Sequence, residues 1–188
     1  KQIEELKKTG VLEEMIQLPI SDYLIILGCN IYQVFFSLYK ILIVLVLGSI
    51  FSKSILIEFS FILHLFLTLL FFISSLIFLS LISSSLSILF SRSRIFPVTF
   101  VFLSIIFGGV YFPEQLIYGR LYFISYVLPI EPSLDILRML TDKKFNSSEF
   151  YENIFHLILL TIFYGILSSV SLKKSIRYAK KNGSLLFY

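Results

Sequence analysis

Long apolar stretches, separated by short charged or turn-forming segments, dominate this chain. Four stretches approach the roughly 20 apolar residues that a membrane-crossing helix needs, and the charges gather between them. We expect spans at about residues 23–51, 55–81, 95–112 and 151–172. Residues 1–188 then form a single all-α, polytopic helical membrane domain.

Three further segments do not fit the spanning pattern. Residues 1–20 mix Lys and Glu with apolar positions on both sides of Gly10, which is typical of short amphipathic helices lying on a membrane surface. Residues 113–148 hold apolar pieces of about ten residues between turn formers, and such pieces suit re-entrant or interfacial helices better than spans. We expect residues 173–188 to form a basic tail. We also expect Ser21 or Asp22 to cap the first span and Ser133 to cap a short helix through Leu140.

The composition excludes a soluble domain. Hydrophobic residues make up 57% of the 188 residues and charged residues only 15%, which is more apolar side chain than a soluble core of this size can hide. The net charge of +4 comes from Lys and Arg flanking the spans, so it indicates membrane topology rather than nucleic-acid binding. Cys29 is the only cysteine, which excludes a disulfide within the chain.

The basic residues also predict an orientation. If the spans alternate, one side of the membrane holds ten of the sixteen Lys and Arg residues: Lys1, Lys7, Lys8, Arg92, Arg94, Lys173, Lys174, Arg177, Lys180 and Lys181. The other side holds Lys53, Arg120, Arg138, Lys143 and Lys144. Cytoplasmic loops carry the excess of basic residues, so we expect both termini of the chain in the cytoplasm and residues 113–148 outside a plasma membrane.

Polar residues inside the expected spans are candidates for function. Lys40 either extends to the outer interface or lines an internal path, and His64 is a second possible path-lining residue. His64 and His156 have no Cys or carboxylate at ligand spacing, so we expect hydrogen-bonded buried histidines and no metal site.

Catalytic chemistry is not indicated. No serine nucleophile with a base stands out, and for Glu131 and Asp135 we expect capping and solvation. The stretch GSIFSKS at 48–54 looks like a damaged phosphate-binding loop, but Ser52 replaces its second glycine and it follows a membrane helix rather than a strand. We therefore expect no enzyme activity and no cofactor in this chain.

The chain resembles the ABC-2 type transporter permeases. The resemblance rests on FGGVYFP at 107–113, YVLP at 126–129 and LDILR at 134–138, together with KTGVLEEMIQLPIS at 8–21. These correspond to the family's glycine-aromatic-proline turn, its Tyr-x-x-Pro segment, its short helix ending in Arg and its cytoplasmic segment before the third span. The chain departs from the family pattern at Val11, where Thr is frequent, and at Glu131-Pro132, which replaces an apolar-Thr pair.

The resemblance implies a role for each motif. An ATPase-coupling segment would include Gly10, Leu12, Glu13, Glu14 and Pro19. An exit-side turn and re-entrant segment would include Gly108, Gly109, Phe112, Pro113, Tyr126, Pro129 and Arg138. Family members have six spans and pair as two permease copies with two ATPase subunits, which bind ATP and Mg²⁺.

The leading hypothesis is therefore a permease subunit of an ATP-driven exporter. The four spans would be the third to sixth of the family, so we expect a fragment that begins after the first two, in keeping with a start at Lys1 rather than Met. Two alternatives remain: a non-transporting membrane scaffold or assembly protein, and an ion-coupled carrier or channel that uses Lys40 and His64. The substrate is not indicated.

Overall fold

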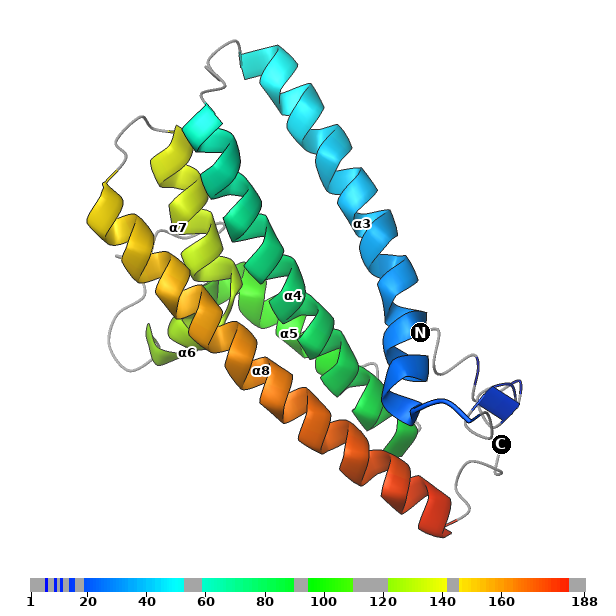
Figure 1. Ribbon diagram of the computed structural model, residues 1–188. Coiled ribbons are helices and arrows are strands. Elements are labelled where there is room, and N and C mark those ends of the chain that lie inside the picture. Colours follow the sequence, from blue (N-terminus) through cyan, green and yellow to red (C-terminus); the bar gives the residue numbers. More distant parts are fainter. Residues whose placement is uncertain are drawn as a thin grey trace.

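The chain folds into helices in a computed structural model that describes residues 19–52, 59–89, 95–109, 122–141 and 146–182 together with Leu6, Thr9, Val11, Glu14 and Met15. The helices are α3 (Asp22–Ser52), α4 (Phe59–Leu89), α5 (Ile95–Phe107), α6 (Tyr122–Val127), α7 (Ile130–Thr141) and α8 (Ser147–Asn182) (Figure 1). No strand occurs in these described ranges, and the predicted all-α class is confirmed there.

Three of the described helices are long and apolar enough to cross a membrane. Their apolar segments are Tyr23–Ile41 in α3, Ile62–Leu89 in α4 and Ser147–Lys181 in α8. The expected span at 95–112 corresponds to α5, which has only 13 residues and is followed by a bend at Gly108 and Gly109. At 1.5 Å per residue α5 is about 20 Å long, which is less than the roughly 30 Å of a bilayer core.

Two of the long helices extend beyond the expected spans. The span expected at 55–81 corresponds to α4, which begins at Phe59 within the described residues and continues to Leu89, because serine hydroxyls bond back to carbonyls of the preceding turn and are satisfied without leaving the helix. Ser84 Oγ donates to Ser80 O at 2.8 Å, and Ser87 Oγ donates to Ser83 O at 3.1 Å. The expected basic tail from residue 173 is likewise helical as far as Asn182.

Side-chain caps explain where two helices begin. Ser21 precedes α3, and its Oγ accepts a hydrogen bond from Leu24 N at 3.3 Å, which confirms the predicted cap. Asn146 precedes α8, and its Oδ1 accepts from Ser148 N at 3.2 Å. Asn146 Nδ2 also donates to Glu149 Oε1 at 2.8 Å, so cap and first turn are tied together.

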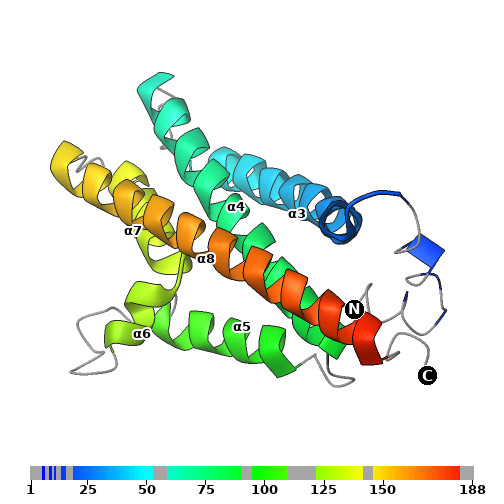
Figure 2. The same cartoon turned by 60° about the horizontal axis from the view of Figure 1, so that its bottom comes forward.

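Helices α4 and α8 form the centre of the bundle and lie side by side in both views (Figures 1 and 2). One cluster of buried residues joins Ile26 at the start of α3 to Leu81 and Ile88 of α4 and to Leu172 and Ile176 of α8. The beginning of α3, the end of α4 and the end of α8 therefore meet at one end of the molecule.

Polar contacts also join the long helices. Asn30 Nδ2 of α3 donates to Ser84 Oγ of α4 at 3.3 Å. Thr161 Oγ1 of α8 donates to the carbonyl oxygen of Phe71 in α4 at 3.2 Å, and also to its own Leu157 O at 2.8 Å. Hydroxyl contacts between apolar helices are typical of membrane helix packing, where small polar residues let the backbones approach closely.

The short helices α5 and α7 lie beside different halves of the long pair. In Figures 1 and 2, α5 follows the half nearer the end of α8, and α7 follows the half nearer its beginning, with α6 between them. Packing agrees with the views, since α7 contacts both α4 and α8 while α5 contacts α6 and α4. The three short helices α5, α6 and α7 therefore lie along both halves of the long pair.

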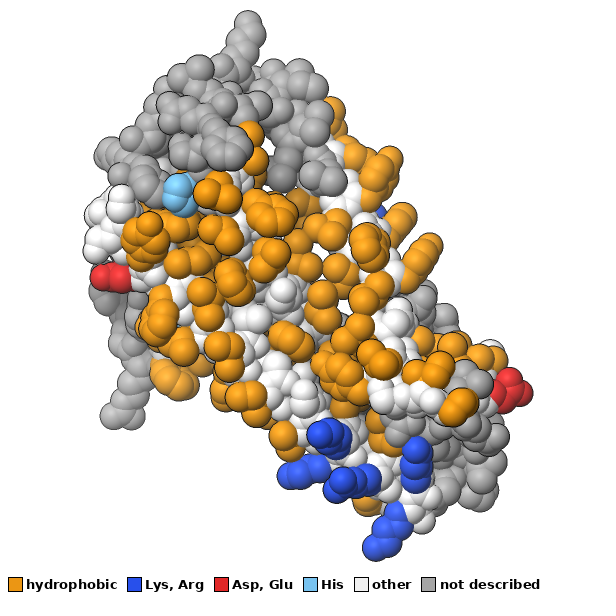
Figure 3. Space-filling model, in the orientation of Figure 1, with side chains coloured by type: hydrophobic (Ala, Val, Ile, Leu, Met, Phe, Trp, Pro, Cys, Tyr) orange, Lys and Arg blue, Asp and Glu red, His pale blue; other side chains and the backbone are white. Residues whose placement is uncertain are grey.

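Much apolar surface faces outward. Helix α3 packs on the bundle mainly through its first turns, and beyond them Tyr32 and Phe35 are both 68% exposed. Figure 3 shows hydrophobic side chains over most of the described surface in that view. Such a surface is typical of a helical membrane protein, in which lipid or a partner helix covers the apolar side chains.

Candidate functional site

The most irregular described backbone is the turn that ends α5. Gly108 N still donates to Ser104 O at 3.0 Å, which continues the helical bonding by one residue. Gly109 then adopts φ 69°, in the left-handed region where a residue with a Cβ is strained. A glycine in this conformation just past a helix is a common way to end it. The predicted break at Gly108 and Gly109 is present.

At Gly108 the requirement for glycine is steric rather than conformational. A Cβ at this position would overlap the side chain of Ile130 and the carbonyl oxygen of Ser104. Ile130 is the first residue of α7, so the end of α5 and the beginning of α7 touch at this glycine. Two helix termini therefore meet beside α4 and α8, part-way along the bundle rather than at its end (Figure 2).

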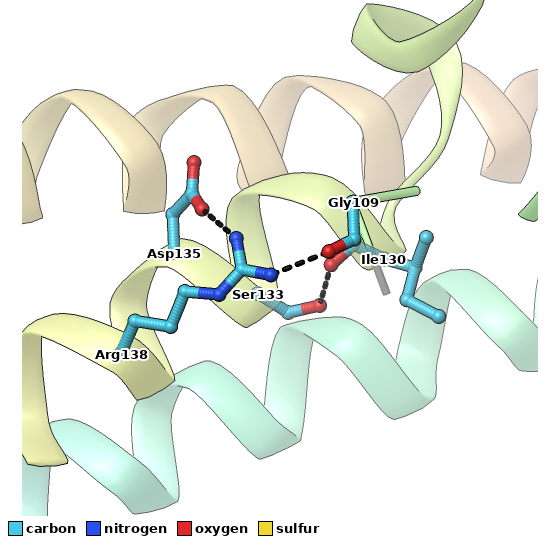
Figure 4. A network of polar contacts seen from close by, with 5 residues as sticks. All are labelled: Gly109, Ile130, Ser133, Asp135 and Arg138. Atoms are coloured by element: carbon cyan, nitrogen blue, oxygen red, sulfur yellow. Dashed lines mark hydrogen bonds and ion pairs between the residues drawn. The ribbon is translucent and has the colours of Figure 1, made fainter. Parts of the chain in front are cut away.

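Arg138 ties α7 to this turn. Its Nη2 donates to the carbonyl oxygen of Gly109, and its Nη1 lies 3.2 Å from Asp135 Oδ1, one turn earlier on α7 (Figure 4). The hydrogen bond from a charged donor is worth about 1.5–3 kcal/mol, whereas the half-exposed ion pair is worth about 1 kcal/mol or less. Arg138 thus acts mainly on the backbone of the break. We name Gly108, Gly109, Ile130, Ser133 and Arg138 the helix-break site.

The first turn of α7 is buried, which corrects two expectations. The helix begins at Ile130, so Ser133 is not its cap; its Oγ donates instead to Pro129 O at 2.8 Å and Ile130 O at 2.9 Å. Glu131 is only 5% exposed, so the expected solvation of this carboxylate is wrong. The reason is tertiary, because α7 packs against α4 and α8 and turns its beginning inward. Glu131 lies where the helix dipole favours a negative charge.

Two side chains of α8 hold the turn between α6 and α7. Pro129 has no backbone N–H group, and the last carbonyl groups of α6 accept hydrogen bonds from side chains of α8 instead. Tyr164 Oη donates to Val127 O at 2.7 Å, and His156 Nε2 lies 2.9 Å from Tyr126 O. A carbonyl oxygen only accepts, so Nε2 carries the proton. The ring of Tyr126 also stacks on His156 with centroids 3.9 Å apart.

The candidate residues Lys40 and His64 lie against different aromatic rings. Lys40 is exposed, and its Nζ lies 4.6 Å from the ring centroid of Phe36 on the same helix. His64 packs edge-to-face on Phe150 of α8, with centroids 4.5 Å apart. His156 is half-buried and hydrogen-bonded, as expected. Among the described residues, no group of three or more His, Cys, Asp or Glu side chains could hold a metal ion.

Several candidate residues lie outside the described part of the chain. These are Gly10, Leu12 and Glu13 of the coupling segment, and Phe112 and Pro113 after the glycine turn. Glu14 is described and exposed, within helical backbone. Pro19 is exposed at a bend three residues before α3. Exposure leaves both residues accessible to a partner.

Tyr164 and Ile130 are contributors that sequence reasoning did not single out, whereas Ser133 was expected as a cap and not as a donor to the carbonyls of Pro129 and Ile130. His156 and Tyr164 are eight residues apart on one helix, a spacing that puts them on one face, and this could have been noticed. Nothing in the sequence points to their partners, the carbonyls of Tyr126 and Val127. The close approach of Ile130 to Gly108 has no sequence signal beyond the glycine itself.

The helix-break site and the turn after α6 join the short helices to one another and to α8. Two short helices, α5 and α7, touch at a glycine turn, and three side chains, Arg138, His156 and Tyr164, donate hydrogen bonds to the nearby backbone. Comparison of the chain with known protein families, with curated proteins and with solved structures finds no match.

Proposed function

We propose that this chain is a permease subunit of an ATP-driven exporter of the ABC-2 type, embedded in the plasma membrane through its long helices. The observation that carries the proposal is the glycine break between α5 and α7, half-way along a bundle of long apolar helices. Irregular backbone at membrane depth is tolerated only where protein covers it or a water-filled cavity meets it. A transport path provides that setting.

The sequence motifs support the same proposal. FGGVYFP at 107–113 includes the break, and LDILR at 134–138 ends in the arginine that bonds to it, so two separate parts of the resemblance meet in one contact. ATP and Mg²⁺ would bind to a separate ATPase subunit, and a second permease copy would complete the path. The amphipathic segment before α3 would dock on the ATPase.

In this mechanism the two ends of the bundle communicate through the long helices. Closure of the ATPase dimer would push on the segment that includes Glu13 and Glu14, and α3 and α4 would tilt with it. The turn at Gly109 would then let α5 and α7 change their relative angle. A ligand shifts such an equilibrium only by binding the two conformations unequally.

The test is capture of the ATPase subunit that this proposal requires. We expect the double variant Glu13→Ala/Glu14→Ala to weaken capture about tenfold, because charged contacts at a docking interface are lost. The matched control is Glu149→Ala/Glu152→Ala, which removes two exposed carboxylates near the beginning of α8, at the far end of the bundle. Equal capture by wild type and the Glu13/Glu14 variant would reject the docking role.

Buried Glu131 favours a second candidate function, an ion-coupled carrier. A carboxylate 5% exposed within a bundle of apolar helices is a candidate for carrying a proton or cation. Transport in proteoliposomes separates the two functions. Dependence on ATP and the ATPase subunit supports the permease, whereas dependence on an ion gradient that is lost in Glu131→Gln supports the carrier. A scaffold would show neither.

A further inference from the structure

Helix α8 carries a ridge of basic side chains where its apolar part ends. The residues are Lys173, Lys174, Arg177, Lys180 and Lys181, all of them exposed, and we name them the basic ridge. Figure 3 shows Lys and Arg side chains gathered at the end of the molecule where α8 ends. Positions separated by three, four, seven and eight residues share one face of a helix, so the ridge is a single surface.

Packing of the opposite face fixes the direction of this surface. Leu172, Ile176 and Ala179 are buried and contact Ile26 of α3 and Ile88 of α4. The last turns of α8 are therefore held against the bundle by apolar contacts, and the basic ridge points away from it. A helix held in this way presents its charges in a fixed arrangement rather than on a flexible tail.

The ridge also continues an apolar stripe. Ile166 is 63% exposed and Val170 is 45% exposed, and they share a helix face with Lys173 and Arg177. Along this face the side chains change from apolar to basic within about one turn, or roughly 5 Å of helix. Where the apolar part of this helix face contacts acyl chains, the basic side chains one turn further along lie at the level of the lipid headgroups.

We propose that the basic ridge binds the headgroups of anionic phospholipids in the leaflet that borders the end of α8. Lys ammonium and Arg guanidinium groups donate to phosphate oxygens, and several basic residues directly beyond a membrane helix attract anionic lipid. A zwitterionic headgroup carries its own positive charge and gains less. The inference rests on α8 crossing the membrane, which is part of the proposed function, but not on transport or on an ATPase.

The chain has no tryptophan, so one introduced by Val170→Trp would be the sole reporter, on the apolar stripe beside the ridge. We would reconstitute the full chain in phosphatidylcholine vesicles containing brominated phosphatidylcholine or brominated phosphatidylglycerol, which quench tryptophan on contact. Quenching by brominated phosphatidylcholine reports lipid contact itself. We expect brominated phosphatidylglycerol to quench more strongly than brominated phosphatidylcholine, with a quenching ratio of about three. High salt should lower this ratio toward one.

The quadruple variant Lys173→Gln/Lys174→Gln/Arg177→Gln/Lys181→Gln, in the same reporter background, should reduce the preference to about one. Its matched control neutralises three Lys and one Arg expected on the other side of the membrane: Lys53→Gln/Arg120→Gln/Lys143→Gln/Lys144→Gln. The control should keep the preference. Because the ridge residues are exposed, we expect the variant to fold, and elution in size exclusion checks this.

Each result has a distinct meaning. Absence of quenching by brominated phosphatidylcholine would overturn the membrane placement of α8, and the ridge proposal with it. Normal quenching without a preference for phosphatidylglycerol would overturn only the ridge proposal, as would a preference that survives the quadruple variant or disappears in the control. Loss of ATPase capture in the quadruple variant, without any lipid preference in the wild type, would assign the ridge to an acidic protein partner instead.

Discussion

At the scale of single residues, Gly108 and Gly109 depend on two different physical constraints. Gly108 lacks space for a Cβ because Ile130 and the carbonyl of Ser104 fill it, whereas Gly109 needs a positive φ. The first constraint comes from the contact of α5 with α7 and from the backbone of α5, whereas the second comes from the turn itself. Replacements at the two positions therefore test different parts of the helix-break site.

Gly109→Ala should destabilise the folded protein by about 1–2 kcal/mol, the cost of a left-handed conformation for a residue with a Cβ. For a chain of 188 residues this corresponds to an unfolding midpoint roughly 2–8 °C lower in detergent. The matched control is Gly28→Ala inside α3, where an added Cβ meets nothing within 4 Å and should be neutral or slightly stabilising. Equal midpoints for the two variants would show that the turn at Gly109 is not needed in the folded state.

Residue identity alone predicted only part of this site. The pair of glycines before Pro113 marked the break, because glycine is a poor helix former and proline ends helices. The partner of Arg138 was not predictable in the same way. Its guanidinium reaches a carbonyl 29 residues earlier in the chain, and only the packing of α7 brings the two together.

At the scale of elements, α6 and α7 depend on α8 for their position. α6 has six residues and α7 has twelve, and isolated helices of these lengths are marginal. The hydrogen bonds from His156 and Tyr164 to the end of α6, together with the burial of Leu128 and Pro129, supply what the short helices lack. Releasing these bonds should loosen the turn before it affects the long helices.

Tyr164→Phe should expose α6, because it leaves the carbonyl of Val127 without its donor at a cost of about 1–3 kcal/mol. The reporter is Ser125→Cys in a Cys29→Ser background; Ser125 is fully buried and its hydroxyl has no hydrogen-bond partner within the described part of the chain, so the thiol should fit. We expect maleimide labelling about tenfold faster than with Tyr164 intact.

The control for this experiment is Tyr178→Phe, which removes a hydroxyl from a tyrosine on the same helix that is 56% exposed. Its labelling rate should match that of the reporter alone. Faster labelling in both variants would point to a general loosening of α8, and unchanged labelling in Tyr164→Phe would show that the hydrogen bond does not hold α6.

At the scale of the whole molecule, the described helices predict a topology that can be measured. The beginning of α3 and the end of α8 lie together, and the beginning of α8 lies at the other end of the bundle (Figure 1). We predict that α3 and α4 cross the membrane in opposite directions, and that α5, α6 and α7 together make the third crossing before α8 returns.

Single cysteines at exposed positions test this topology with a membrane-impermeant maleimide, again in a Cys29→Ser background. Ser148→Cys should label in intact cells, whereas Ile20→Cys and Lys181→Cys should label only in inside-out vesicles. The physical reason is the excess of basic residues at the end of the bundle shared by α3 and α8. Labelling of all three positions from one side would contradict the crossing of the bundle.

The sequence by itself determined the all-helical, apolar class of the protein, the approximate location of its long helices and the break at Gly108 and Gly109. Apolar length, the serine cap before α3 and the glycine pair act within a few residues, so they can be interpreted without the fold. It did not determine that α5 is too short to cross alone, because the pattern at 95–112 reads as one apolar stretch on both sides of the glycines.

Only the tertiary structure decided which polar groups meet. Glu131 is buried because α7 lies against α4 and α8, and Arg138 bonds to Gly109 because the two short helices touch end to end. The basic ridge points away from the bundle because the opposite face of α8 packs on α3 and α4. These outcomes depend on contacts between residues far apart in the chain, and local pattern carries no information about such pairings.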